Sequence, residues 1–168
     1  MIRRRPTRLA TGSPLVLTLL SAVLGALLLV QPEARADALG ALKGHIFVSA
    51  SEFGSGYESD AAMAAAIKKQ STTVIKGDNA WTINLAVFLK EAAGANKINI
   101  VYYDLSAKHE QVNFSEVDVK PDQKMVQLNG IALSSDLGFV KGHKYDILAT
   151  RLIGGKEKVY AKATITLK

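Results

Sequence analysis

Residues 145–167 read YDILATRLIGGKEKVYAKATITL and contain the two clearest strand patterns of the chain. In the second pattern, every other residue from Val159 to Leu167 is apolar, which is the period of a strand with one buried face and one wet face. Gly154 and Gly155 separate the two patterns, and two strand patterns around such a pair predict a β-hairpin. We therefore expect residues 145–153 and 156–167 to pair as antiparallel strands.

Further strand patterns lie upstream of this hairpin. The strongest covers residues 81–90, where alternate side chains from Trp81 to Leu89 are apolar and share one face. In residues 111–119 we expect Val112, Phe114, Val117 and Val119 to face inward together. The complete set of expected strands is 45–50, 81–90, 97–105, 111–119, 125–133, 145–153 and 156–167.

One helix is expected before the main run of strands, over residues 59–70. Ser59 or Asp60 caps the free amides at its start, and the segment that follows is rich in alanine. Lys68 and Lys69 come in the last turn, where the helix dipole favours cations.

The order of these elements indicates the fold class. Seven expected strands joined by short turns, with one helix, are typical of two packed antiparallel sheets. A parallel, doubly wound sheet is disfavoured because helical stretches do not alternate with the strands. We therefore expect a mainly β fold, a two-sheet antiparallel sandwich forming a single domain over residues 44–168, preceded by a flexible lead-in over residues 37–43.

The segment Val140–Ala149, sequence VKGHKYDILA, resembles the start of the sixth strand in fibronectin type III and other immunoglobulin-like domains. In those domains a glycine stands three residues before a tyrosine, as Gly142 stands before Tyr145 here. The resemblance implies a tyrosine corner, in which the Tyr145 ring packs inward and its hydroxyl bonds the backbone upstream. It concerns about ten residues and the fold, and it implies no activity. The chain departs from the immunoglobulin pattern because it has no cysteine and carries Trp81 on the second expected strand.

Residues 1–36 have the three parts of an export signal. Arginines at positions 3, 4, 5 and 8 precede an apolar run over residues 15–30, and Ala34-Arg35-Ala36 follows. This pattern predicts cleavage after Ala36 and a secreted, periplasmic or cell-envelope location. The alternative is that residues 15–30 stay uncleaved as a membrane anchor, since the run is long for the hydrophobic region of a signal peptide.

Removal of this segment changes the charge of the protein. The whole chain has a net charge of +6, whereas residues 37–168 contain 16 Lys plus Arg and 14 Asp plus Glu. The charges are spread along the mature chain without a basic cluster, so nucleic acid is not expected as a partner. The absence of cysteine excludes disulfides and thiolate metal sites.

No group of residues in the sequence matches a known catalytic, cofactor or metal motif. His45, His109 and His143 lie on separate elements, and Glu116, Asp118 and Asp122 do not have the spacing of a calcium loop. Ser55, between two glycines, lacks the spacing of a nucleophile elbow. We therefore expect no catalytic residue, no cofactor and no metal site.

Two features are candidates for surface contact. Tyr160 has the polar parity of the last strand, which predicts an exposed ring. In an immunoglobulin topology, the connections 91–96, 120–123 and 153–156 collect at one end, and loops on a rigid sheet are favourable places for binding.

The leading hypothesis is an exported, non-enzymatic module that contacts an unidentified protein or cell-surface component. Two alternatives stay open: a secreted enzyme of the hydrolase class with a site assembled from loops, and an envelope structural subunit anchored by residues 15–30. If the signal is cleaved, no stable membrane insertion is expected. The sequence leaves the oligomeric state and the strand order undecided.

Overall fold

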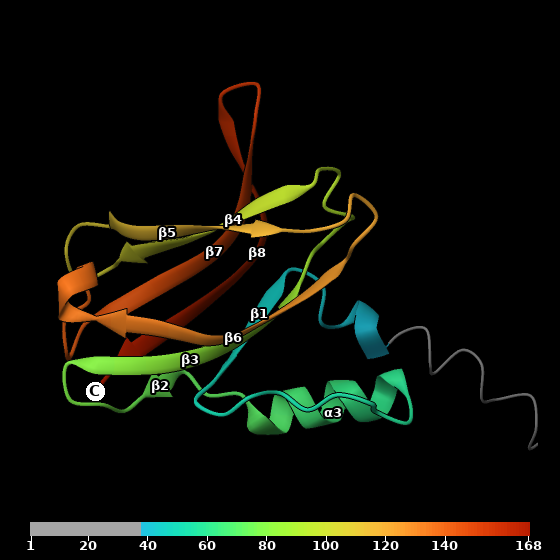
Figure 1. Ribbon diagram of the computed structural model, residues 1–168, viewed down its shortest axis with the longest axis horizontal. Coiled ribbons are helices and arrows are strands. Elements are labelled where there is room, and N and C mark those ends of the chain that lie inside the picture. Colours follow the sequence, from blue (N-terminus) through green and yellow to red (C-terminus); the bar gives the residue numbers. More distant parts are fainter. Residues whose placement is uncertain (1–37) are drawn as a thin grey trace, which may run out of the picture. The chain divides into compact units, whose positions relative to one another are not determined.

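A computed structural model describes residues 38–168 and is mainly β (Figure 1). The export signal expected over residues 1–36 lies outside the described residues. The strands are β1 His45–Ser49, β2 Val74–Ile75, β3 Ala80–Phe88, β4 Lys97–Asp104, β5 Glu110–Asp118, β6 Met125–Ser134, β7 Lys144–Ile153 and β8 Lys156–Leu167. Helix α3 covers Asp60–Gln70, and a short 3-10 helix, η1, covers Ser135–Leu137. Between residues 38 and 168, no helix is both long and apolar enough to cross a bilayer.

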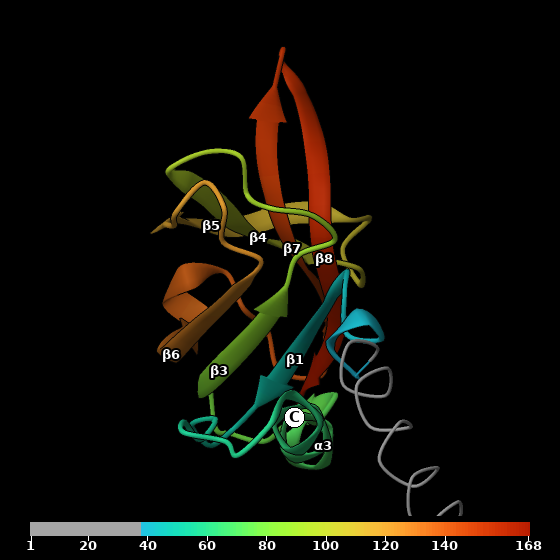
Figure 2. The same ribbon diagram turned by 90° about the vertical axis from the view of Figure 1, so that its right-hand side faces the viewer.

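All eight strands belong to one sheet, which curls around a single main core (Figures 1 and 2). The strand order is β5-β4-β7-β8-β1-β3-β6, and the short β2 pairs separately with β8. Most neighbours are antiparallel, but β1 and β2 run parallel to β8. The structure therefore has one curled mixed sheet where the sequence predicted a two-sheet antiparallel sandwich. The two expected sheets are one because β1 pairs with β8. This pairing connects the strands β5-β4-β7-β8 to the strands β1-β3-β6.

The concave face of the sheet holds the main core. Trp81 lies in it, as do alternate residues of β3, β4, β7 and β8. The Trp81 indole nitrogen donates a hydrogen bond to the Lys168 carbonyl oxygen over 3.2 Å, which connects the start of β3 to the end of β8. A second, smaller core lies where α3 packs on the other side of β1 and β3, through Ile67, Ala64 and Phe88.

The helix and the lead-in differ in how well the sequence predicted them. The helix is confirmed, because α3 begins at Asp60 and the Ser59 hydroxyl accepts a hydrogen bond from the Ala62 amide over 3.2 Å. The lead-in was expected to be flexible, yet Leu42 is fully buried in the smaller core. The compact part of the chain therefore starts before Gly44.

The C-terminal hairpin is confirmed, with β7 and β8 paired along their full length. Its far end extends beyond the rest of the sheet in both views (Figures 1 and 2). The ladder shifts register between Ala149 and Thr150, whose partners are Ala161 and Val159. Tyr160 is the extra residue at this shift, and it is only 2% exposed. The prediction of an exposed Tyr160 ring was therefore wrong, because a bulge changes which side chains face the core.

Candidate functional site

One end of the sheet brings together two connections that are far apart in the sequence, 91–96 and 120–123. The Arg151 guanidinium, near the tip of β7, donates hydrogen bonds to the carbonyl oxygens of Ala93 and Gly94 over 3.1 and 2.7 Å. The amides of Ala93 and Gly94 in turn bond the carbonyl oxygens of Gln123 and Pro121 over 3.0 and 2.8 Å. These bonds hold the connections 91–96 and 120–123 together beside Arg151. The sequence had grouped both with the connection 153–156, but that end of the hairpin extends beyond the sheet (Figures 1 and 2).

A groove of about 400 Å³ runs along the convex face of the sheet at this end. Phe114 on β5 and Leu152 on β7 belong to its walls, and these side chains are 60% and 65% exposed. The complete lining is Asn99, Val101, Tyr103, Gln111, Phe114, Thr150, Leu152, Gly155 and Glu157. The groove therefore presents two large apolar side chains to solvent on a frame of paired strands.

Phe114 corrects a prediction from the sequence, which expected its side chain to face inward with those of Val112 and Val117. The β4–β5 ladder shifts register between Tyr102 and Tyr103, so β5 contains one extra residue near Val112. Simple alternation alone places Phe114 and Val117, three residues apart, on opposite faces, and the extra residue moves Val112 to the side of Val117. Val112 and Val117 pack against the main core, whereas Phe114 lies on the convex face.

The electrostatic character of the groove is acidic. Glu157 is the only charged residue in its lining, and its carboxylate accepts a long hydrogen bond of 3.4 Å from the Tyr103 hydroxyl. Partial burial, and then the charge of Glu157, raise the pKa of Tyr103. The Tyr103 ring also stacks on His109, with 4.7 Å between the ring centroids. At neutral pH the groove therefore carries a negative charge and no positive one.

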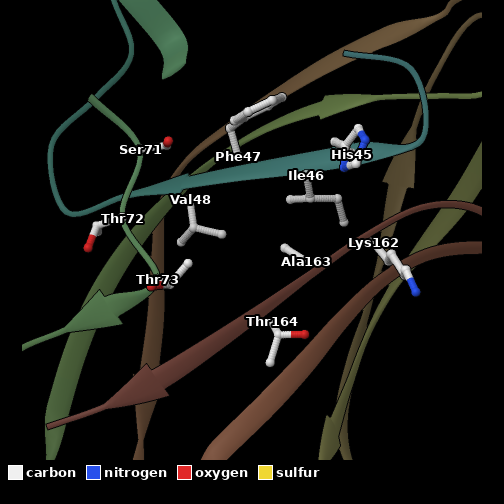
Figure 3. A pocket seen from close by; sticks show the side chains of 10 residues that line it. All are labelled: His45, Ile46, Phe47, Val48, Ser71, Thr72, Thr73, Lys162, Ala163 and Thr164. Carbon is white, nitrogen blue, oxygen red and sulfur yellow. The ribbon is translucent and has the colours of Figure 1, made fainter. Parts of the chain in front are cut away.

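A second hollow, of about 500 Å³, lies where β1 and β8 separate (Figure 3). The two strands share a single ladder pair, His45 with Lys162, and then diverge. Residues 71–73 close the far end, where the Thr72 amide bonds the Val48 carbonyl oxygen over 2.7 Å. Ile46, Val48 and Ala163 line the hollow, together with hydroxyl groups from threonine and serine. His45 and Lys162 also line the hollow, which therefore combines apolar, hydroxyl and basic side chains.

Tyr145 forms the corner that the immunoglobulin-like resemblance implied. Its ring is fully buried, and its hydroxyl accepts a hydrogen bond of 2.7 Å from the Val140 amide, five residues upstream. Beside it, the imidazole Nδ1 of His143 lies 2.7 Å from the carboxylate of Asp104. The same carboxylate accepts a hydrogen bond of 2.8 Å from the Ser106 amide. This cluster ties the end of β4 to the start of β7.

The Asp104 carboxylate is stabilised in its charged form. Burial alone raises the pKa of Asp104, but the hydrogen bonds from His143 and from the Ser106 amide outweigh burial and leave that pKa below its usual value. Within residues 38–168, no hydrogen bond joins His143 to a serine or threonine hydroxyl. The geometry of this pair therefore fits a structural role at the corner.

The remaining residues singled out in the sequence do not come together. His45 lies beside the β1–β8 hollow, His109 on Tyr103 and His143 on Asp104. Glu116 pairs with Lys97 on the neighbouring strand. Among residues 38–168, no group of three or more His, Asp or Glu side chains is placed to hold a metal ion.

The predicted glycines occupy turns that need them. Gly142, Gly154 and Gly155 have backbone φ values of +86°, +58° and +77°, a region that residues other than glycine rarely adopt. Gly154 and Gly155 form the tip of the β7–β8 hairpin, and Gly142 precedes the corner at Tyr145.

No protein-family model, no curated protein and no solved structure matches this chain. The functional argument therefore rests on the geometry of the chain itself.

We predict opposite effects for the removal of two buried tyrosine hydroxyls. Within residues 38–168 the buried Tyr102 hydroxyl has no hydrogen-bond partner, so Tyr102→Phe should raise the free energy of unfolding by about 1 kcal/mol. Tyr145→Phe removes the hydroxyl that accepts the hydrogen bond from the Val140 amide. This change should lower the free energy of unfolding by about 1–2 kcal/mol. Urea unfolding of both variants measures this. Destabilisation by Tyr102→Phe equal to that of Tyr145→Phe would contradict the assignment.

A second prediction concerns pH. Because the pKa of Asp104 is lowered in the folded state, its contribution to stability is present above the unfolded pKa and is lost as pH falls through the folded value. Asp104→Asn should therefore cost about 1–3 kcal/mol at pH 7, with a smaller difference from the parent chain below about pH 4. Urea unfolding at both pH values tests this. The exposed Asp78, changed to Asn, is the control and should alter stability little. A pH-independent loss in Asp104→Asn would count against the charged carboxylate.

Proposed function

We propose that this chain is an exported, non-enzymatic module that works by contact with another protein or a cell-envelope component, and that the groove between Phe114 and Leu152 is the contact surface. The observation that carries the proposal is the exposure of these two side chains on either side of the groove. Burial of a side chain of this size contributes about 1.5–3 kcal/mol. Neighbouring apolar side chains at the surface are typical of interaction sites.

The frame around the groove supports this proposal. Its floor includes Asn99 and Val101 from β4 and Thr150 from β7, and both of these strands are paired on each side. Arg151 fixes the neighbouring connections through Ala93 and Gly94. Such a surface changes little on binding, so little of the binding free energy is spent on ordering.

The likeness to immunoglobulin-like domains is part of the proposal. It is supported by the Tyr145 hydroxyl bond to the Val140 amide, while the single curled sheet departs from a sandwich. Folds of this kind host many binding roles and imply no activity of their own. Export is proposed from the pattern of residues 1–36.

The contact surface is tested by capture of the partner in the organism that carries the protein. The tagged full chain is crosslinked in intact cells, and the attached molecules are quantified by mass spectrometry. We expect the double variant Phe114→Ser, Leu152→Ser to reduce capture more than tenfold, since each change removes about 1.5–3 kcal/mol of apolar burial.

Leu137→Ser is the matched control, because Leu137 is an exposed leucine outside the groove, and it should leave capture unchanged. Equal capture by the parent and double-variant chains would overturn the assignment of the groove. N-terminal sequencing of the captured chain tests export in the same sample. A chain that begins at Asp37 supports cleavage, whereas retention of residues 15–30 supports the anchored alternative.

A further inference from the structure

β5 is an edge strand with little cover on either face. It pairs with β4 on one side only, and none of its nine residues is buried. Every other strand of the described chain has at least one buried residue. Long exposed edges are the places where another extended chain can add to a sheet.

The direction of the backbone groups in β5 follows from the ladder. The Val119 amide donates to the Asn96 carbonyl oxygen over 2.9 Å, so residues 119 and 117 point their backbone groups toward β4. Since bonded and non-bonded pairs alternate in an antiparallel ladder, Glu116 and Asp118 point theirs outward. Both residues therefore offer an amide and a carbonyl group to a further strand.

The other edge of the sheet, β6, is better protected. The Gln123 side-chain amide donates to the Met125 carbonyl oxygen over 2.8 Å, and the Phe139 amide donates to the Ser134 carbonyl oxygen over 3.1 Å. Between these ends, Gly130 has a φ of +68° beside a register shift. Bulges and capped ends hinder strand addition. The free edge of β5 is therefore the more receptive of the two.

The charges and the alternation of the β5 side chains indicate which kind of segment could pair with this strand. Its charged residues, Glu110, Glu116 and Asp118, are all acidic, and the adjoining groove adds Glu157. Glu116 and Asp118 share the convex face with Phe114, because successive side chains of a strand alternate. Val117, on the other face, is only partly buried against the main core. Lys97 of β4 lies on the convex face too and forms an ion pair with Glu116. An added strand therefore meets two carboxylates and this lysine on one face and apolar surface on the other.

We propose that the β5 edge takes up an extended segment of a partner protein as an added strand, and that this segment alternates basic and apolar residues. The basic side chains pair with Asp118 and compete with Lys97 of β4 for Glu116, and the apolar ones cover Val117. Main-chain hydrogen bonds to residues 116 and 118 supply affinity, and the alternation supplies specificity. This inference rests on the proposed contact function, since it names the way in which the partner binds.

The probe for this mode is a synthetic peptide of alternating valine and lysine, added to the isotopically labelled full chain and followed by NMR. We expect the amide signals of Glu116 and Asp118 to shift most. Glu116→Pro removes an outward amide without breaking the β4 ladder and should weaken binding about tenfold. Glu116→Gln keeps the amide and should weaken it only about threefold. A valine–glutamate peptide is expected to bind more than tenfold more weakly than the lysine peptide.

Three outcomes would overturn the proposed strand addition. These outcomes are equal binding of the two peptides, equal effects of Glu116→Pro and Glu116→Gln in chains with unchanged circular dichroism, and shifts confined to other parts of the sheet. Self-association of the chain that Glu116→Pro abolishes would assign the edge to a second copy instead. Capture from cells separates the two proposals: loss in the groove double variant with no loss in Glu116→Pro supports the groove and refutes strand addition.

Discussion

The structure depends on one constraint: a single sheet must bury its apolar face against itself. The described chain has no second sheet, and α3 covers only a small area through Ile67 and Ala64. The sheet therefore curls until β3, β4, β7 and β8 surround one core. The parallel join of β1 to β8 makes this curl continuous, and it also opens the hollow between these strands. Without cysteine, the arrangement has no disulfide and depends on noncovalent contacts.

A sheet that curls without closing leaves two edge strands, here β6 and β5, and these two strands differ in how well their outer sides are covered. β6 has capped ends and an irregular centre, and Val126 and Leu133 are buried. Within residues 38–168, β5 has outward backbone groups at Glu116 and Asp118, acidic side chains and an exposed Phe114, whose own amide bonds the Asn113 side chain. Since the groove begins at Phe114 and ends at the hairpin, the unprotected edge and the groove form one continuous surface. That continuity links the architecture to the proposed contact function.

The sequence predicts the features that depend on local chemistry. The hairpin follows from alternation around Gly154 and Gly155, the helix from the Ser59 cap, and the Tyr145 corner from its resemblance to a known turn. Prediction from the sequence fails where a strand contains one residue more than its partner, because the extra residue changes which side chains face the core. The extra residue buries Tyr160, and a similar shift near Val112 separates it from Phe114. The groove was missed because Phe114 was assigned to the face of Val117, although residues three apart in a strand face opposite sides. Strand order was beyond local patterns because it is set by pairings between distant segments. An acidic strand with weak alternation was the available signal of an uncovered edge.

The central claim is that the outer edge of β5 is free in the isolated protein. Amide hydrogen exchange followed by NMR tests it at single residues. The account predicts rapid exchange for the amides of Glu116 and Asp118 and slower exchange for those of Ser115 and Val117, which face β4. Protection of Glu116 and Asp118 as strong as that of the interior strand β7 would show that the edge is already paired, and would contradict the account.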